Sequence, residues 1–116
     1  MRIEIEIKDK DIVDALCTAL EGGSNYWYWI EELPEGLSNE FSTSESIINW
    51  ILCNPENKIE ITDVDTDEIL GYLCKDNIKL GLELFIENDY IFDPAMDANE
   101  ADILFQYIVM GEVVYG

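Results

Sequence analysis

The stretch KIEITDVDTDEILGYLC, residues 58–74, holds the pattern that decides the fold class. Residues 58–64 alternate polar and apolar side chains, which is typical of a strand with one buried face. Residues 69–74 have the composition of a second strand, and the polar residues 65–68 connect the two. A short polar connection between two such runs predicts an antiparallel hairpin.

Helical patterns flank this hairpin on both sides. Before it, Asp9 or Asp11 is expected to cap a helix that the pair Gly22-Gly23 ends, with glycine in the left-handed conformation of a C-cap. A second helix is expected to follow a capping box in which a serine, Ser42, precedes a glutamate by three residues. Pro55 then stops this helix.

Two further helices are predicted after the hairpin. Asp76 is expected to cap the first of them, which contains Gly81. Asp97, followed three residues later by Glu100, opens the second, which ends near Gly111. Residues 88–94 between them read as a loop or a short extended piece.

Three more segments are candidate strands. Residues 2–7 alternate strictly, residues 25–30 are either a strand or a continuation of the preceding helix, and residues 111–116 form a plausible terminal strand. The whole pattern predicts an α+β fold, in which a single compact domain of 116 residues packs a small, mostly antiparallel sheet against three to four helices.

The net charge is the most pronounced global property. The chain has 26 acidic and 6 basic residues, a formal net charge of −20. Such a charge disfavours direct binding to nucleic acid or to an anionic membrane, since both need lysine and arginine. It favours a partner with a basic surface, although an acidic, solvated surface without any partner is the simpler interpretation.

Several chemistries are excluded or disfavoured by composition. The chain contains no histidine, which removes Ser-His-Asp and Cys-His catalysis and histidine zinc sites. The cysteines Cys17, Cys53 and Cys74 are far apart and odd in number, so we expect reduced core thiols in a cytosolic protein. No catalytic or nucleotide-binding motif is present, and we expect a non-enzyme that needs no cofactor. The N-terminal residues do not resemble a signal peptide, and no apolar run is long enough to span a bilayer.

The acidic residues of the hairpin connection resemble a calcium loop only in part. Asp63, Asp65 and Asp67 fit its first, third and fifth positions. The sixth position, which should be glycine, is Glu68, and the twelfth, which should be a glutamate, is Cys74. We therefore expect an acidic turn and no metal site.

The segment EGGSNYWYW, residues 21–29, is the candidate site. Two glycines expose backbone N–H groups next to four aromatic rings, and that combination can hold a base or a nucleotide. Alternatively, the glycines cap a helix and the rings fill the core, which we expect for at least two of the four. Any ring left outside would suit a protein interface.

Two blocks of the chain are similar to a family of small, uncharacterised phage and prophage proteins. The first block reads EGG-x-x-YW, and the second runs from the alanine at 101 to the terminal glycine. The matching residues are Glu21, Gly22, Gly23, Tyr26, Trp27, Ala101, Asp102, Gln106, Tyr107, Gly111, Glu112, Val113, Val114, Tyr115 and Gly116. Met110 departs from the family, where phenylalanine is usual. The resemblance implies a phage origin, the cytoplasm of a bacterial host and an accessory role.

If the last helix packs on the first, the two blocks meet at one end of the domain, as a shared pocket or a shared structural lock. The candidate partner-binding or ligand-binding residues are Glu21, Gly22, Gly23, Asn25, Tyr26, Trp27, Tyr28, Trp29, Gln106 and Glu112.

Three functions remain open from the sequence. The first is an acidic interaction protein that mimics DNA and blocks a basic surface of a host defence protein, as an anti-CRISPR or anti-restriction inhibitor would. The second is a protein that binds or sequesters a nucleotide-like ligand at residues 21–29. The third is a domain whose two blocks are purely structural. The oligomeric state stays open, a homodimer included.

Overall fold

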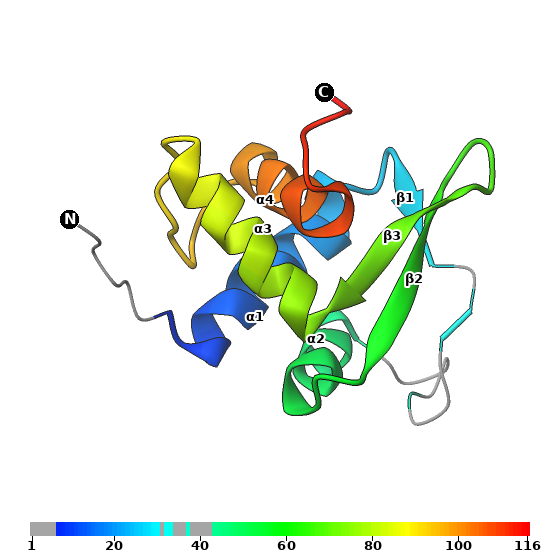
Figure 1. The fold of residues 1–116 in the computed structure, drawn as a ribbon, viewed down its shortest axis with the longest axis horizontal. Helices are drawn as coiled ribbons and strands as arrows, with labels where there is room; N and C mark the ends of the chain where they lie inside the picture. Colours follow the sequence, from blue (N-terminus) through cyan, green and yellow to red (C-terminus); the bar gives the residue numbers. More distant parts are fainter. Residues whose placement is uncertain (1–6, 31, 34–36, 38–42) are drawn as a thin grey trace.

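Helices and one small sheet make up the part of the chain that the computed structural model describes, residues 7–30, 32–33, 37 and 43–116 (Figure 1). The elements, in chain order, are α1 (Asp9–Thr18), a short π-helix η1 (Ala19–Gly23), β1 (Tyr28–Trp29), α2 (Ser44–Cys53), β2 (Lys58–Asp63), β3 (Ile69–Cys74), α3 (Lys75–Glu87) and α4 (Ala98–Met110). The predicted α+β fold is confirmed.

The sheet is antiparallel, with the strand order β1-β2-β3. The predicted hairpin is therefore confirmed as β2 and β3, which pair from Lys58 opposite Cys74 onward. The register shifts next to Ile61, so that one strand carries an extra residue there. Such a bulge increases the local twist of the hairpin. Strand β1 adds only two residues to the other edge of β2.

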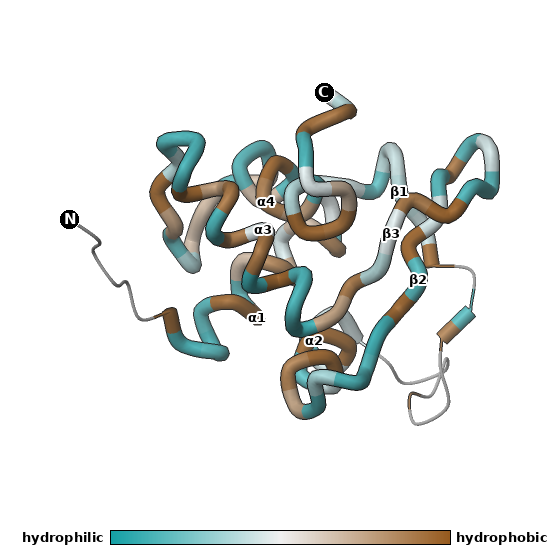
Figure 2. Tube along the Cα trace, viewed as in Figure 1, coloured by the Kyte–Doolittle hydropathy of each residue, from teal (hydrophilic) through white to brown (hydrophobic). Residues whose placement is uncertain are grey.

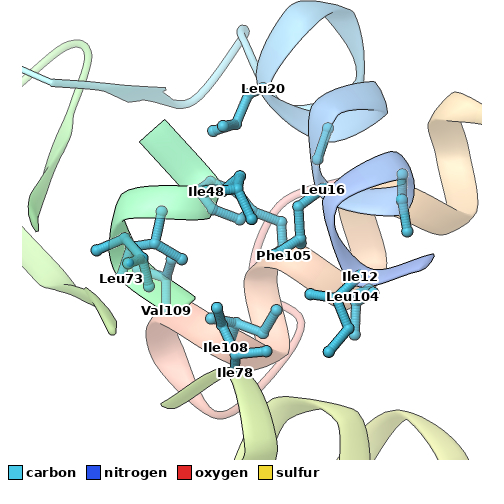
Figure 3. Close-up of a cluster of buried hydrophobic side chains, with 14 of the residues drawn as sticks. Ile12, Leu16, Leu20, Ile48, Leu73, Ile78, Leu104, Phe105, Ile108 and Val109 are labelled. Carbon is cyan, nitrogen blue, oxygen red and sulfur yellow. The ribbon is translucent and has the colours of Figure 1, made fainter. Parts of the chain in front are cut away.

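The helices enclose the core on one side of this sheet. Figure 1 shows α3 and α4 next to each other, and Figure 3 shows side chains of α1, α2, α4 and β3 converging on one cluster. Its fully buried members include Leu16, Ile48, Leu73, Leu104 and Phe105. Buried apolar residues recur at helical spacing, as Ile12 and Leu16 do in α1 and Phe105 and Val109 do in α4, so each helix has one apolar face to bury.

Two glycines permit this close packing. A Cβ atom at Gly71 in β3 would collide with the carbonyl oxygen of Val109 in α4. A Cβ atom at Gly81 in α3 would collide with Ile108. Helix α4 thus approaches both the sheet and α3 at distances that no larger residue allows.

The predicted helix starts are only partly right. Asp97 is the N-cap of α4, and its side chain accepts a hydrogen bond from the backbone N–H of Glu100, as expected. The cap of α1 is Lys8 rather than an aspartate, and that of α3 is Cys74 rather than Asp76. Asp9, Asp11 and Asp76 lie in the first helical turns instead, where their charge complements the helix dipole.

Helix α2 has a capping box, one residue later than predicted. Thr43 is the N-cap, and its side chain accepts a hydrogen bond from the backbone N–H of Ser46. The hydroxyl of Ser46 in turn accepts one from the backbone N–H of Thr43. A serine thus takes the role that the sequence assigned to a glutamate.

The structure gives a different result for each of the three candidate strands. Residues 2–6 lie outside the described part of the chain. Residues 25–30 form a turn and only the two-residue strand β1, because the backbone of Trp27 is still engaged in the turn that follows η1. The prediction of a terminal strand is wrong, since residues 113–116 have no regular structure. Their backbone bonds to the side chain of Gln106 instead of to a neighbouring strand.

Other expectations are corrected by burial and backbone angles. Gly22 and Gly23 are not left-handed; among the described glycines only Gly111, the C-cap of α4, has a positive φ, 77°. The cysteines are free, but Cys17 and Cys74 are half-buried and Cys53 is exposed, so the expectation of core thiols is wrong. None of the helices in the described residues is long and apolar enough to cross a bilayer.

Candidate functional site

The candidate site centres on two polar side chains that α4 places in the protein interior. Asp102 and Gln106 lie one helical turn apart and are 5% and 0% exposed. They share the buried face of the helix with Phe105 and Val109, because residues spaced by three or four positions lie on the same side. An aspartate at such a position must find hydrogen-bond donors or destabilise the fold.

The carboxyl group of Asp102 accepts four hydrogen bonds. Its Oδ1 accepts from the hydroxyl of Ser24 at 2.8 Å and from Nε1 of Trp27 at 2.7 Å. Its Oδ2 accepts from the hydroxyl of Tyr26 and from Nε2 of Gln106 at 3.2 Å. All four partners are neutral donors, an arrangement that suits an ionised carboxylate. We call these five residues the Asp102 network.

Gln106 connects this network to the C-terminal tail, residues 111–116. Its Oε1 accepts from the backbone N–H groups of Val114 at 2.8 Å and Tyr115 at 2.9 Å. Its Nε2 donates to the carbonyl oxygen of Tyr115 at 3.1 Å, besides its bond to Asp102. One side chain therefore replaces the strand partner that the tail lacks.

Tyr115 fixes the tail to two further segments. Its ring stacks on that of Trp27, with centroids 5.2 Å apart and an interplanar angle of 9°. Its hydroxyl donates to Oδ2 of Asp63 in the hairpin at 2.7 Å. This bond raises the pKa of Tyr115 to about 12 and, together with backbone N–H donors, lowers the pKa of Asp63.

The other aromatic residues of the segment are also engaged within the domain. The ring of Trp27 contacts Phe105 with centroids 5.4 Å apart. Tyr28 packs edge-on against Phe105 and donates its hydroxyl to the carbonyl oxygen of Leu20 at 2.9 Å. Burial raises the pKa of Tyr28 to about 12, and burial with the bond to Asp102 does the same for Tyr26.

The glycine pair has a packing role at its second position. A Cβ atom on Gly23 would lie 2.5 Å from the carbonyl oxygen of Ala98, at the start of α4. A Cβ atom on Gly22 would meet nothing within 4 Å. Gly23 thus lets η1 approach α4 closely enough for Ser24 to reach Asp102.

The structure brings only part of the predicted site together. Tyr26, Trp27 and Gln106 converge on Asp102. Trp29 is 43% exposed and lies in the strand pair with Thr62. Within the described residues the side chains of the other three polar candidates form no hydrogen bond and are exposed; these are Glu21, Asn25 and Glu112.

The expectation for the aromatic rings is met. Trp27 is buried and Tyr28 is half-buried, while the side chains of Tyr26 and Trp29 are 53% and 43% exposed to solvent. The expected meeting of the two sequence blocks also occurs, through part of the expected residues, since Tyr26 and Trp27 of the first block and Gln106 of the second bond to Asp102. Glu21 and Glu112 take no part, and the contacts run through Asp102 and Gln106.

Sequence reasoning missed the central residue of this site. Asp102 interrupts the apolar face of α4, and a charged residue on such a face is the signal that would have identified it. Ser24 and Tyr115 carry no comparable signal, because their partners are more than 50 residues away in the chain.

Hydrogen bonds to the side chain of Asp63 close the hairpin turn. Oδ1 of Asp63 accepts from the backbone N–H groups of Asp65 at 2.8 Å and Thr66 at 3.0 Å. Asp67 has a positive φ of 61°, which aspartate tolerates in a tight turn. Within the described ranges no group of three or more acidic or cysteine side chains could hold a metal ion.

No family model, curated protein or solved structure matches this chain. The chemistry of the site must therefore be read from its geometry. The carboxylate of Asp102 is fully used by donors of the domain itself, and the ring of Trp27 is covered by Tyr115. Such an arrangement can join four segments rigidly, and it presents no activated nucleophile.

Proposed function

We propose that this chain is an acidic interaction protein that binds a basic surface of a partner protein. The observation that carries the proposal is the charge. With 26 acidic and 6 basic residues, most carboxylates have no basic residue of the same chain to pair with. Among the described residues, exposed acids occur in α1, η1, α2 and α3 and are most closely spaced in the hairpin turn, at Asp65, Asp67 and Glu68.

The arrangement of the aromatic residues supports a protein partner over a small ligand. The Asp102 network uses its own donors and acceptors within the domain, so it offers little to a nucleotide. The rings of Tyr26 and Trp29, in contrast, are partly exposed in a chain with a net charge of −20. Exposed aromatics with a charged rim are typical of protein interfaces.

A finer form of the proposal is mimicry of DNA. A dense set of carboxylates can occupy a surface that normally receives phosphates, and it would then block nucleic-acid binding by the partner. The resemblance to phage and prophage proteins makes a bacterial host protein, such as a defence nuclease, the natural target.

The test is capture on the immobilised chain from a nuclease-treated bacterial lysate at low salt. Each retained protein is then purified and its affinity measured at several salt concentrations. We expect a nucleic-acid-binding protein whose affinity falls steeply with salt, since screening weakens long-range charge attraction. Retention of proteins whose affinity is independent of salt would contradict the proposal, as would the retention of none.

A further inference from the structure

Four apolar or aromatic side chains are exposed around the C-terminal tail. Tyr26 is 53%, Val64 42%, Val113 44% and Val114 54% exposed. Figure 2 shows hydrophobic colouring on the tail after α4, and Figure 1 places the tail, β1 and the hairpin turn toward the same side of the molecule. We call these four residues the tail surface.

Contacts within the domain connect the four residues to one pair of stacked rings. The backbone N–H of Val64 donates to the carbonyl oxygen of Trp27 at 2.9 Å, and Trp27 stacks on Tyr115. Val113 and Val114 directly precede Tyr115. Tyr26 and Gln106, which holds the backbone of Val114, both donate to Oδ2 of Asp102. The segments that carry the tail surface are therefore joined to one another through Trp27, Tyr115 and Gln106.

The tail surface is also held in place before any partner arrives. The hydroxyl of Tyr26 is bonded to Asp102, so its ring has a fixed direction although half of it faces solvent. The amide side chain of Gln106 bonds to the tail backbone at Val114 and Tyr115. The ring of Tyr115 stacks on Trp27, and its hydroxyl bonds to Asp63. An ordered aromatic and aliphatic surface loses little conformational entropy on binding, which favours its use in recognition.

Carboxylates adjoin this surface on the hairpin side. Asp63 contacts Tyr115 directly, and the exposed acids Asp65, Asp67 and Glu68 belong to the same turn as Val64. We propose that the tail surface is where the partner binds, and that the partner presents an arginine-bearing segment there. Arginine fits because its guanidinium stacks on an aromatic ring and pairs with carboxylates in the same contact.

This inference rests on the proposed function and locates its interface. The first test measures binding of fluorescent nona-arginine by anisotropy for two matched variants, each lacking three negative charges. One is D65N/D67N/E68Q in the hairpin turn, and the control, D14N/E45Q/E56Q, removes exposed acids from α1, from α2 and from the segment that follows α2. We expect the hairpin variant to raise the Kd about fivefold or more and the control about twofold or less.

The outcomes of this test separate the two proposals. Equal losses in both variants would overturn the tail surface as the interface, while salt-sensitive binding by the wild type would leave the proposed function standing. An absence of binding by the wild type at about 50 mM salt, where screening is weak, would overturn both.

The second test isolates the ring of Tyr26. Tyr26→Phe and Tyr26→Leu both remove the hydroxyl that bonds Asp102, but only the first keeps an aromatic ring. Wild type and Tyr26→Phe are expected to prefer nona-arginine over nona-lysine by about threefold, and Tyr26→Leu is expected to lose this preference. An equal preference in the two variants would show that the ring is not in the contact and would overturn the proposal.

Discussion

Replacing Asp102 by asparagine tests the role of the buried network most sharply. Asparagine has the same shape, but it offers one oxygen and one NH₂ group in place of two acceptor oxygens. The oxygen can keep the bonds from Ser24 and Trp27. The NH₂ group then faces Nε2 of Gln106, a donor, and Gln106 cannot rotate its amide because Oε1 already holds the tail.

The expected cost follows from these contacts. One bond to a charged group is lost, and bonds that remain lose their ionic character; hydrogen bonds to charged groups contribute about 1.5–3 kcal/mol and neutral ones about 1 kcal/mol. Part of this loss is offset because a buried charge no longer has to be desolvated. We therefore expect Asp102→Asn to lower the free energy of unfolding by about 2–4 kcal/mol, a large share of the total of about 5–15 kcal/mol that is usual for a domain.

Urea unfolding followed by tryptophan fluorescence measures this change. The matched control is Asp14→Asn, which removes the same charge from an exposed position on α1 and should change the free energy of unfolding by less than about 0.5 kcal/mol. If Asp102→Asn is as stable as this control, the four hydrogen bonds do not stabilise the fold and our reasoning about the network is wrong.

Three other outcomes are expected. Gly23→Ala should lower the free energy of unfolding by about 1–3 kcal/mol, because its Cβ meets the carbonyl oxygen of Ala98. Gly22→Ala, whose Cβ meets open space, should raise the free energy of unfolding by about 0.5–1 kcal/mol. Thermal unfolding measures both changes, and equal effects would contradict the packing role of Gly23. In a double-mutant cycle, Glu21→Ala and Gln106→Ala should be additive within about 0.5 kcal/mol, and a larger coupling would mean that the two side chains interact. The pKa of Tyr26, Tyr28 and Tyr115 is raised to about 12 in the folded chain, whereas tyrosines of the unfolded chain titrate near pH 10. The stability that these tyrosines contribute is therefore complete below pH 10, and the free energy of unfolding should fall as the pH rises from about 10 to 12. A Tyr28→Phe variant should show a smaller fall over the same pH range. An unchanged slope in that variant would contradict the assignment to buried tyrosine.

The elements that the sequence predicted well are those determined by local patterns. The alternation around Ile59 and Ile61 and the polar turn after them specify the hairpin without help from distant residues. The same holds for α4, where Asp97 caps the helix and Gly111 ends it. Both ends depend on backbone geometry that aspartate and glycine favour locally.

The elements predicted badly depend on contacts between distant parts of the chain. Val113 and Val114 have the composition of a strand, but the backbone of their segment bonds to the side chain of Gln106. No local sequence pattern predicts this contact. Ser24 and Asp102 are 78 residues apart, and their contact requires the close approach of η1 and α4 at Gly23. The candidate site was therefore located in the right segment, while its central carboxylate was missed.

Competition with DNA shows whether this chain occupies the nucleic-acid-binding surface of its partner. A captured, purified partner is titrated with a fluorescent duplex while increasing amounts of this chain are added. We expect the chain to raise the apparent Kd of the partner for the duplex in proportion to the concentration of the chain, and we expect this effect to weaken with salt. A ternary complex, in which the partner holds the duplex and this chain together at unchanged affinity, would contradict this expectation.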